Sequence, residues 1–331
     1  MRYKNRSVRI KFLVAVGIIV LPASGFILGV FCGKTGRGFC PFTKKTQIWS
    51  IGIYEGSSIT NLRASPTVRN PVLTAADVND VDAEFVADPF MIEHKGKWYM
   101  FFEVMNKKTK QGSIGLAISD DCLYWNYKQI VLQEPFHLSY PYIFEWQDEF
   151  YMIQQARSGF SIVLYKAVDF PTKWSFYKEI IYGDYCDPSI VRYDGKWWIF
   201  TSDQPFWNNL HLFYADNLAG PWVAHPKSPV VRNNRGIARP GGRILVYDGR
   251  IIRFGQDCLG SYGKQLRAFE VTKLTTEDYE EKEIAGSPIL VGSGKGWNAD
   301  GMHQLDLHKT DGGWIGCVDG WRTRLLFGLK P

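Results

Sequence analysis

Residues 86–104 read VADPFMIEHKGKWYMFFEV, an apolar segment, a Lys-Gly pair and a second segment rich in aromatic residues. Glycine tolerates the backbone of a tight turn, and apolar and aromatic residues favour strands. The stretch therefore predicts a β-hairpin. Asp88 stands at the start of its first strand and Glu103 at the end of its second.

The chain repeats this hairpin. The copies read YPYIFEWQDEFYMIQQ at 140–155, CDPSIVRYDGKWWIFTS at 186–202, RPGGRILVYDGRIIRFGQ at 239–256 and, more loosely, GMHQLDLHKTDGGWIGCVD at 301–319. The starts at 88, 140, 187, 239 and about 302 are 47 to 63 residues apart. Because a four-stranded propeller blade needs about 40–50 residues, this period predicts an all-β, five-bladed β-propeller.

The segment Gln47–Tyr54, QIWSIGIY, has the alternation of a strand but precedes the first full repeat. We expect it to complete the last blade beside a C-terminal strand at 324–327. Closing the ring with strands from both ends of the chain removes the exposed sheet edges of an open array. The predicted propeller domain is therefore 47–331.

The N-terminal residues predict a membrane anchor. Residues 1–11 hold five basic residues and no acid, and 12–32 are 21 residues without a charge. That length crosses a hydrocarbon core of roughly 30 Å, and the basic flank keeps the N-terminus cytosolic. We expect a cytosolic tail at 1–11, a transmembrane signal anchor at 12–32, a stem at 33–46 and an extracytoplasmic or lumenal propeller, a type II arrangement. The alternative is a signal cleaved near 23–25.

The amino-acid composition argues for a large apolar core and against some classes of ligand. The 331 residues are 45% hydrophobic and 15% aromatic, enough for a large core, and the net charge of +6 is mostly due to the N-terminal tail. No basic face with interleaved aromatics indicates nucleic-acid binding. The six cysteines show no CxxC pair or metal spacing, so buried free thiols are expected, with a disulfide left open. We predict no metal and no cofactor.

The repeats predict one polar site. The first strand of each blade lines a propeller's central channel, so its start lies beside the end of the second strand at one mouth. Two rings of residues then meet there: Asp88, Tyr140, Asp187, Arg239 and, approximately, His303; and Glu103, Gln155, Ser202, Gln256 and Asp319. Filling of a narrow channel is the alternative explanation for some of them.

Carboxylates facing each other across a channel suit glycosidic chemistry, in which one activates water or a hydroxyl and one protonates the leaving oxygen. We predict Asp88 as the base, Asp187 as the acid or as a modulator of a pKa, and Glu103 as a third carboxylate of the catalytic set. Arg239 is suited to hold a carboxylate, phosphate or sugar oxygen, and Tyr140 offers a ring and a hydroxyl.

The chain resembles the N-terminal domain of plant glucosamine inositolphosphorylceramide transferases and their stand-alone bacterial relatives, within the five-bladed glycoside hydrolase-like propellers. The matching runs include ADPF at 87–90, EPFHLSYPYIFEW at 134–146, RPGGR at 239–243, FGQDC at 254–258 and GWNADGMHQLD at 296–306. His137 and Asp257, which lie in these runs, complete the predicted substrate-binding set. The family usually has Pro-Glu where this chain has Gln154-Gln155, and the hydrolases commonly use a blade-three Glu where this chain has Asp187.

The resemblance implies a glycan or glycolipid ligand but not the transferase activity, which belongs to a separate C-terminal module of the plant proteins. Two functions are expected. The first is a membrane-anchored enzyme that cleaves or transfers a glycosyl unit. The alternative is a non-catalytic glycan- or glycolipid-binding propeller that assists a separate glycosyltransferase.

Overall fold

The computed structural model describes residues 43–156 and 160–327. The chain forms two compact units: Ile48–Arg322, and a second unit made of Met1–Gln47 with Thr323–Pro331. In the second unit only the strand ends 43–47 and 323–327 are described. The predicted anchor at 12–32 lies outside the described residues. Among the residues that are described, no helix combines the length and hydrophobicity needed to cross a membrane.

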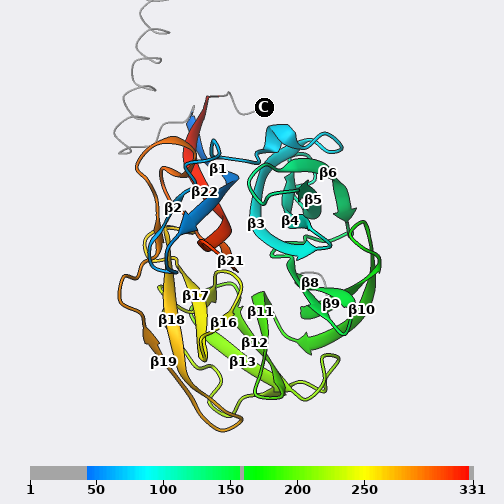
Figure 1. Ribbon diagram of the computed structural model, residues 1–331, viewed down its shortest axis with the longest axis vertical. Helices are drawn as coiled ribbons and strands as arrows, with labels where there is room; N and C mark the ends of the chain where they lie inside the picture. Colours follow the sequence, from blue (N-terminus) through cyan, green and yellow to red (C-terminus); the bar gives the residue numbers. More distant parts are fainter. Residues whose placement is uncertain (1–42, 157–159, 328–331) are drawn as a thin grey trace, which may run out of the picture. The chain divides into compact units, whose positions relative to one another are not determined.

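The described residues form five antiparallel sheets, arranged in Ile48–Arg322 around a common centre (Figure 1). The first three blades follow the chain in order. Their strands are β3 (Ala83–His94), β4 (Lys97–Asn106), β5 (Gly112–Ser119) and β6 (Asn126–Leu132); β7 (Tyr142–Trp146), β8 (Glu149–Ala156), β9 (Ser161–Asp169) and β10 (Lys173–Tyr182); and β11 (Tyr185–Tyr193), β12 (Lys196–Asp203), β13 (Leu210–Ala215) and β14 (Val223–Ala224).

The fourth blade has its inner and outer strands each split in two. It contains β15 (Arg239–Pro240), β16 (Leu245–Tyr247), β17 (Arg250–Asp257), β18 (Gln265–Leu274), β19 (Tyr279–Glu283) and β20 (Leu290–Val291). The inner strand breaks at Gly241-Gly242, where a Cβ on Gly242 would lie 1.8 Å from Leu305 O. This close approach lets Gly242 form a parallel bridge with Leu305 of the next blade.

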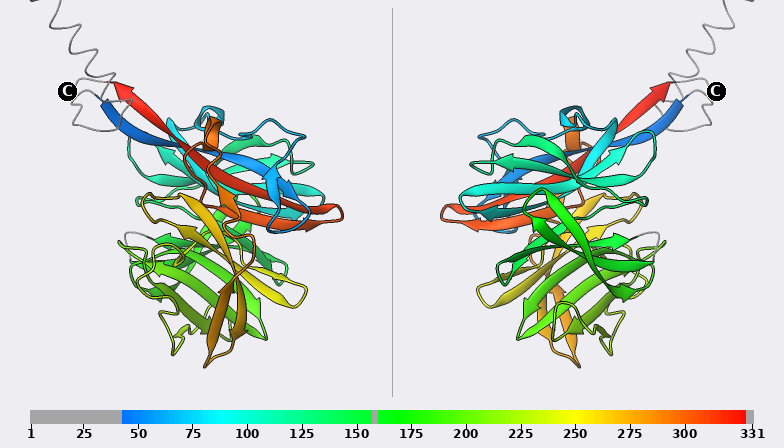
Figure 2. Two further views of the ribbon diagram at one scale, coloured as in Figure 1. Left: turned by 90° about the vertical axis from the view of Figure 1, so that its left-hand side faces the viewer. Right: turned by 90° about the vertical axis from the view of Figure 1, so that its right-hand side faces the viewer.

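The last blade joins both ends of the chain, in the order β2 (Leu62–Ala64), β1 (Thr43–Gly56), β22 (Gly313–Phe327), β21 (Leu305–Thr310). The predicted closure by an N-terminal strand is confirmed, although 324–327 is the end of β22 rather than a separate strand. β21 contacts β3, and Figure 2 shows this seam between the last and first blades from two sides. Two short 3₁₀ helices, η1 (Ala75–Asp77) and η2 (Gly296–Asn298), lie in connections.

Apolar side chains of neighbouring sheets fill the space between blades. One buried cluster combines Phe90 and Phe101 of the first blade with residues of the next two, and the ring of Phe101 meets that of Trp174 in the second blade edge to face, with centroids 5.5 Å apart. The four cysteines in the described part, 122, 186, 258 and 317, are buried and free, which confirms that prediction for these four.

The positions predicted as the starts of three inner strands share an unusual backbone, although β3 begins at Ala83, before Asp88, and β7 begins at Tyr142, after Tyr140. Asp88, Tyr140 and Asp187 have φ of +52°, +56° and +52°, and each precedes a proline. At Asp88 and Asp187 the ladder has a register shift, a β-bulge. Non-glycine residues seldom adopt this left-handed conformation, and bulges redirect side chains. Strained backbone of this kind concentrates at functional sites, so these positions mark the channel mouth as a candidate functional site.

Candidate functional site

Strand pairing brings the two predicted rings together. Glu103 is opposite Ala87, Ser202 is opposite Cys186 and Gln256 is opposite Arg239. In these three blades the predicted positions of the inner strand therefore lie beside those of the neighbouring strand, on the side away from the tight turn.

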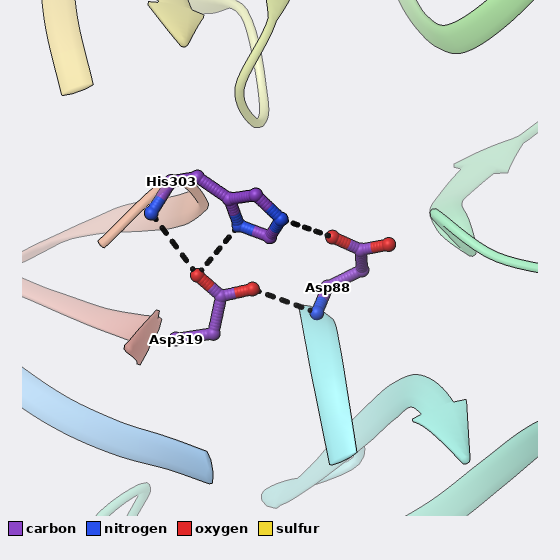
Figure 3. A group of neighbouring side chains, drawn as sticks. All are labelled: Asp88, His303 and Asp319. Atoms are coloured by element: carbon purple, nitrogen blue, oxygen red, sulfur yellow. Dashed lines mark hydrogen bonds and ion pairs between the residues drawn. The ribbon is translucent and has the colours of Figure 1, made fainter. Parts of the chain in front are cut away.

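One group of side chains forms at the seam between the last and first blades (Figure 3). Asp319 Oδ1 accepts hydrogen bonds from His303 Nδ1 at 2.8 Å, from His303 N at 3.2 Å and from Gln304 N at 3.0 Å. Its Oδ2 accepts the backbone N–H of Asp88 at 3.0 Å. His303 Nε2 lies 3.7 Å from Asp88 Oδ1. Asp319 thus fixes both the strained backbone of Asp88 and the ring of His303.

Ligand atoms of Asp88, His303 and Asp319 lie within 4.8 Å of one another, the spacing of a possible metal site. Both oxygens of Asp319 are already satisfied by four N–H groups, and His303 Nδ1 donates to one of them. A metal ion would have to displace these hydrogen bonds. The donor set therefore fits a hydrogen-bonded network better than a metal centre.

A second group comes from the third and fourth blades. Arg239 Nε forms a buried ion pair with Asp187 Oδ2, and Gln256 Nε2 donates to the same oxygen at 2.8 Å. The Arg239 guanidinium carbon lies 4.9 Å from the ring centroids of both Trp207 and Tyr262. Asp187 therefore holds and neutralises Arg239.

Glu103 forms a third group with His137. His137 Nδ1 accepts the Gly112 N–H at 2.9 Å, which leaves Nε2 facing Glu103 Oε1 at 3.5 Å. That separation is beyond a well-formed hydrogen bond. Glu103 Oε1 is buried without a hydrogen-bond partner in the described part of the chain.

Burial dominates the electrostatics of the two first-blade carboxyls. It raises the pKa of Asp88 to about 7, with Asp187 and Asp319 adding to the shift and His303 opposing it. Burial also raises the pKa of Glu103 well above its usual range, and the neighbouring carboxylates raise it further. Burial lowers the pKa of His303, but Asp319 and Asp88 outweigh it and the net shift is upward. Near neutral pH this mouth holds protons on carboxyl groups.

Unpaired polar atoms concentrate at this site. Across 43–156 and 160–327, the buried side-chain atoms without a hydrogen-bond partner are Glu103 Oε1, Gln154 Oε1, Arg239 Nη1, Gln256 Oε1 and both amide atoms of Gln304. Glu103, Arg239 and Gln256 are predicted site residues, and the two other glutamines adjoin predicted site residues in the chain. Since buried polar groups are normally paired, the clustering indicates a place built to bind something polar.

Three of the predicted residues have other contacts. Tyr140 is fully buried, and its hydroxyl bonds to Ser189 Oγ and Gly242 N, both at 2.7 Å, so it presents no free hydroxyl. Ser202 Oγ donates to Asn209 O at 3.0 Å. Asp257 accepts from Gln265 Nε2 at 2.7 Å and from Leu259 N at 3.0 Å, which braces the β17–β18 loop. Gln155 is buried.

The sequence interpretation missed three aromatic residues at the mouth, Trp49, Trp207 and Tyr262. Trp49 stacks on His303 with centroids 4.2 Å apart, and Tyr262 OH lies 3.2 Å from His303 Nε2. They come from loops and from β1, outside the repeated hairpins. The only indication of Tyr262 in the sequence was the pair of nearby glycines, which suggests a tight loop.

A buried ion pair between Arg243 and Asp306 was also missed. Arg243 Nη2 donates to Ile143 O at 2.9 Å and to Met91 O at 3.2 Å, and Asp306 accepts the Met91 N–H at 2.6 Å. The pair thus connects inner strands of four blades. Arg243 lies four residues after Arg239 and Asp306 three residues after His303, so neither falls in the predicted rings.

A separate cavity of about 460 Å³ lies at the tight-turn ends of the first two blades. Its lining includes His94, Lys95, Asp148 and Phe170. These residues are at the opposite strand ends from Asp88 and Glu103, so this cavity contains none of the predicted site residues.

The blades and their polar mouth define a five-bladed propeller with the architecture of glycoside hydrolases. The fold is similar to the β-1,2-mannobiose phosphorylase of Listeria innocua, with a TM-score of 0.58, 13% identity, and coverage of 80% of this chain and 96% of that one. It is also similar to the catalytic domain of the Coprinopsis cinerea family 62 α-L-arabinofuranosidase, with a TM-score of 0.55, 10% identity, and coverage of 82% and 97%. At these identities the likeness concerns the fold alone.

Residues 40–321 match the family model described as glucosamine inositolphosphorylceramide transferase 1, N-terminal, and the chain belongs to this family. It is 34% identical over 310 residues to glucosamine inositolphosphorylceramide transferase 1 of Oryza sativa subsp. japonica, covering 85% of this chain and 42% of the relative. The Arabidopsis thaliana protein of the same name is 35% identical over 298 residues, covering 83% and 39%. The chain spans about two fifths of the length of these curated relatives.

Proposed function

We propose that this protein is a carbohydrate-active propeller that cleaves or transfers a glycosyl unit of a glycan or glycolipid at the mouth of its central channel. The observation that carries the proposal is the buried Glu103 carboxyl near Asp88: its Oε1 accepts no hydrogen bond within 43–156 and 160–327, and the pKa values of both carboxyls are raised. Acid–base chemistry at a glycosidic bond requires one carboxyl that donates a proton and one that accepts a proton, and raised pKa values suit groups that exchange protons near neutral pH.

The proposed roles differ from the sequence interpretation in two respects, the role of Asp187 and the role of Glu103. Asp187 Oδ2 is occupied by Arg239 and Gln256, so Asp187 positions the arginine instead of serving as the acid. Glu103 gives its proton to the leaving oxygen, and Asp88 takes a proton from the incoming water or hydroxyl. Arg239 contributes the unpaired Nη1 to hold a substrate oxygen.

A second candidate is a non-catalytic propeller that binds a glycan or glycolipid for a separate glycosyltransferase. The match to the N-terminal part of proteins named as transferases, over about two fifths of their length, favours it.

The proposal includes attachment to a membrane through 12–32, with the propeller on the extracytoplasmic or lumenal side. The uncharged stretch of 21 residues after five basic residues supports it. Resistance to alkaline extraction and protection of the propeller from external protease in sealed vesicles are expected. Release by alkali would contradict the anchor.

Glu103→Gln and Asp88→Asn test the enzymatic proposal. Asparagine accepts the left-handed backbone at position 88, so the fold should persist. The purified full chain is incubated with 4-nitrophenyl glycosides and with a glycolipid panel, and products are identified by mass spectrometry. We expect each variant to lose turnover by about 100-fold or more while still binding ligand. The exposed-site control Glu145→Gln should match wild type. Ligand binding without turnover in wild type would favour the second candidate.

A further inference from the structure

Tyr262 touches both the seam group and the Arg239 group of the site. Its hydroxyl lies 3.2 Å from His303 Nε2, and the two rings meet edge to face with centroids 5.3 Å apart. The Arg239 guanidinium lies 4.9 Å from the Tyr262 ring centroid. One side chain therefore links the residues around Asp88 with those around Asp187.

The β17–β18 loop holds Tyr262 in this place. Gly263 has φ of +61°, and a Cβ there would lie 2.5 Å from the Trp49 ring and 3.1 Å from His303 Cδ2. Trp321 Nε1 donates to Gly263 O at 2.9 Å. Only glycine fits this approach, so the loop is pressed against the seam with little freedom.

The donors and acceptors around His303 define the hydrogen bond that the Tyr262 hydroxyl can make. His303 Nδ1 donates to Asp319, because Asp319 Oδ1 already accepts two backbone N–H groups and acts as an acceptor. His303 Nε2 then faces the Tyr262 hydroxyl, with Asp88 Oδ1 slightly farther away at 3.7 Å. A hydroxyl can donate to a bare ring nitrogen or accept from a protonated one. Phenylalanine at 262 would keep the ring and lose this ability.

We propose that Tyr262 is a positioning residue that couples the two groups, its ring holding Arg239 against Asp187 and its hydroxyl aligning His303 beside Asp88. This inference deepens the proposed function and rests on it for its catalytic consequence. The coupling itself is a property of the unliganded protein and can be measured without substrate.

The test uses the purified full chain labelled with ¹⁵N-histidine and ¹⁵N-arginine, with signals assigned from His303→Gln and Arg239→Lys. At a pH above the raised pKa of His303, we expect the neutral ring in wild type to be the Nδ1–H tautomer. Tyr262→Phe should shift the His303 Nε2 signal and leave the Arg239 Nε signal in place. Tyr262→Leu, which removes the ring as well as the hydroxyl, should shift both the His303 and the Arg239 signals. Tyr182→Phe, at an exposed tyrosine, is the control and should change neither.

Three results would overturn the coupling: an Nε2–H tautomer of the neutral His303 ring in wild type, a His303 signal unmoved by Tyr262→Phe, or an Arg239 signal unmoved by Tyr262→Leu. Failure of Tyr262→Phe to fold in thermal unfolding would also overturn it, since the residue would then serve the core. With any 4-nitrophenyl glycoside that wild type turns over, Tyr262→Phe should lower kcat about tenfold and leave KM within about twofold. Absence of turnover would refute the proposed function, and the NMR signals would still decide the coupling.

Discussion

Breaking the Arg243–Asp306 ion pair should destabilise the whole propeller. Asp306 is completely buried, and the pair bonds to backbone groups of β3 and β7 as well as joining the fourth and fifth blades. Asp306→Asn keeps the shape of the side chain and removes its charge. The guanidinium of Arg243 is then left in the protein interior opposite a neutral amide.

The expected cost follows from these contacts. Removing one partner of a buried pair costs about 3–5 kcal/mol, because the remaining charge stays buried and uncompensated. At about 2–4 °C per kcal/mol for a domain of this size, Tm should fall by about 6–20 °C. Burial opposes ionisation of Asp306, but Arg243 and His308 outweigh it and hold its pKa below the usual range. The pair's contribution is therefore full at neutral pH and is lost only as pH falls below the ordinary aspartate range.

The assay is thermal and urea unfolding. It compares the wild type with Asp306→Asn, Arg243→Met and the double variant Arg243→Met/Asp306→Leu. The double variant should recover much of the loss, since apolar replacement of both partners removes the uncompensated charge. Arg250→Met, which breaks the exposed pair with Glu270, is the control and should cost less than about 1 kcal/mol. A loss at Asp306 no larger than this control, or additive effects in the double variant, would refute the reasoning.

Three further outcomes are expected. Burial raises the pKa of Asp88 to about 7, so the folded state keeps a proton that the unfolded chain releases near pH 4. Between about pH 4 and 7, the stability of the wild type relative to Asp88→Asn should therefore fall by up to about 1.4 kcal/mol per pH unit. Parallel stability–pH curves of the two proteins would contradict the raised pKa. Asp319→Ala leaves buried N–H donors unpaired and should cost about 3–5 kcal/mol in urea unfolding; a cost below about 1 kcal/mol would exclude its bracing role. With four of the six cysteines buried and free, at most two thiols should react with a thiol reagent in the native state, and more than two would mean that the sheets open.

The architecture was predictable because each blade carries its own sequence signature. The hairpins 86–104 and 186–202 repeat an Asp-Pro start, a Gly turn and an aromatic second strand, and these local features fix strand, turn and register together. Closure by Gln47–Tyr54 followed from the need to remove sheet edges. The split of the fourth blade's inner strand was not predictable, because it depends on Gly242 meeting the backbone of Leu305 in a different blade.

The site was predictable only as a set of positions. Counting along the repeats placed Asp88, Asp187 and Arg239 at one mouth, but the partner of each side chain depends on contacts between blades. Asp187 pairs with Arg239 across 52 residues, and Asp319 reaches Asp88 across 231. The repeats place Asp187 and Arg239 at equivalent positions of consecutive blades, but the period does not specify which side chains pair. Tyr262 stayed hidden for the same reason, since a loop residue has no place in the hairpin alignment.

Ring closure and the geometry of the proposed site depend on the same contacts. Asp319 on β22 holds the backbone N–H of Asp88 on β3, and Trp49 on β1 stacks on His303. The seam between the last and first blades is thus where the strained residue with the raised pKa is fixed. An opening of this seam would release the Asp88 backbone from its left-handed conformation and admit water to the carboxyl, so that its pKa would fall toward the usual range. Closing the propeller with strands from both ends of the chain therefore does more than remove sheet edges: it keeps Asp88 buried and oriented toward the channel mouth.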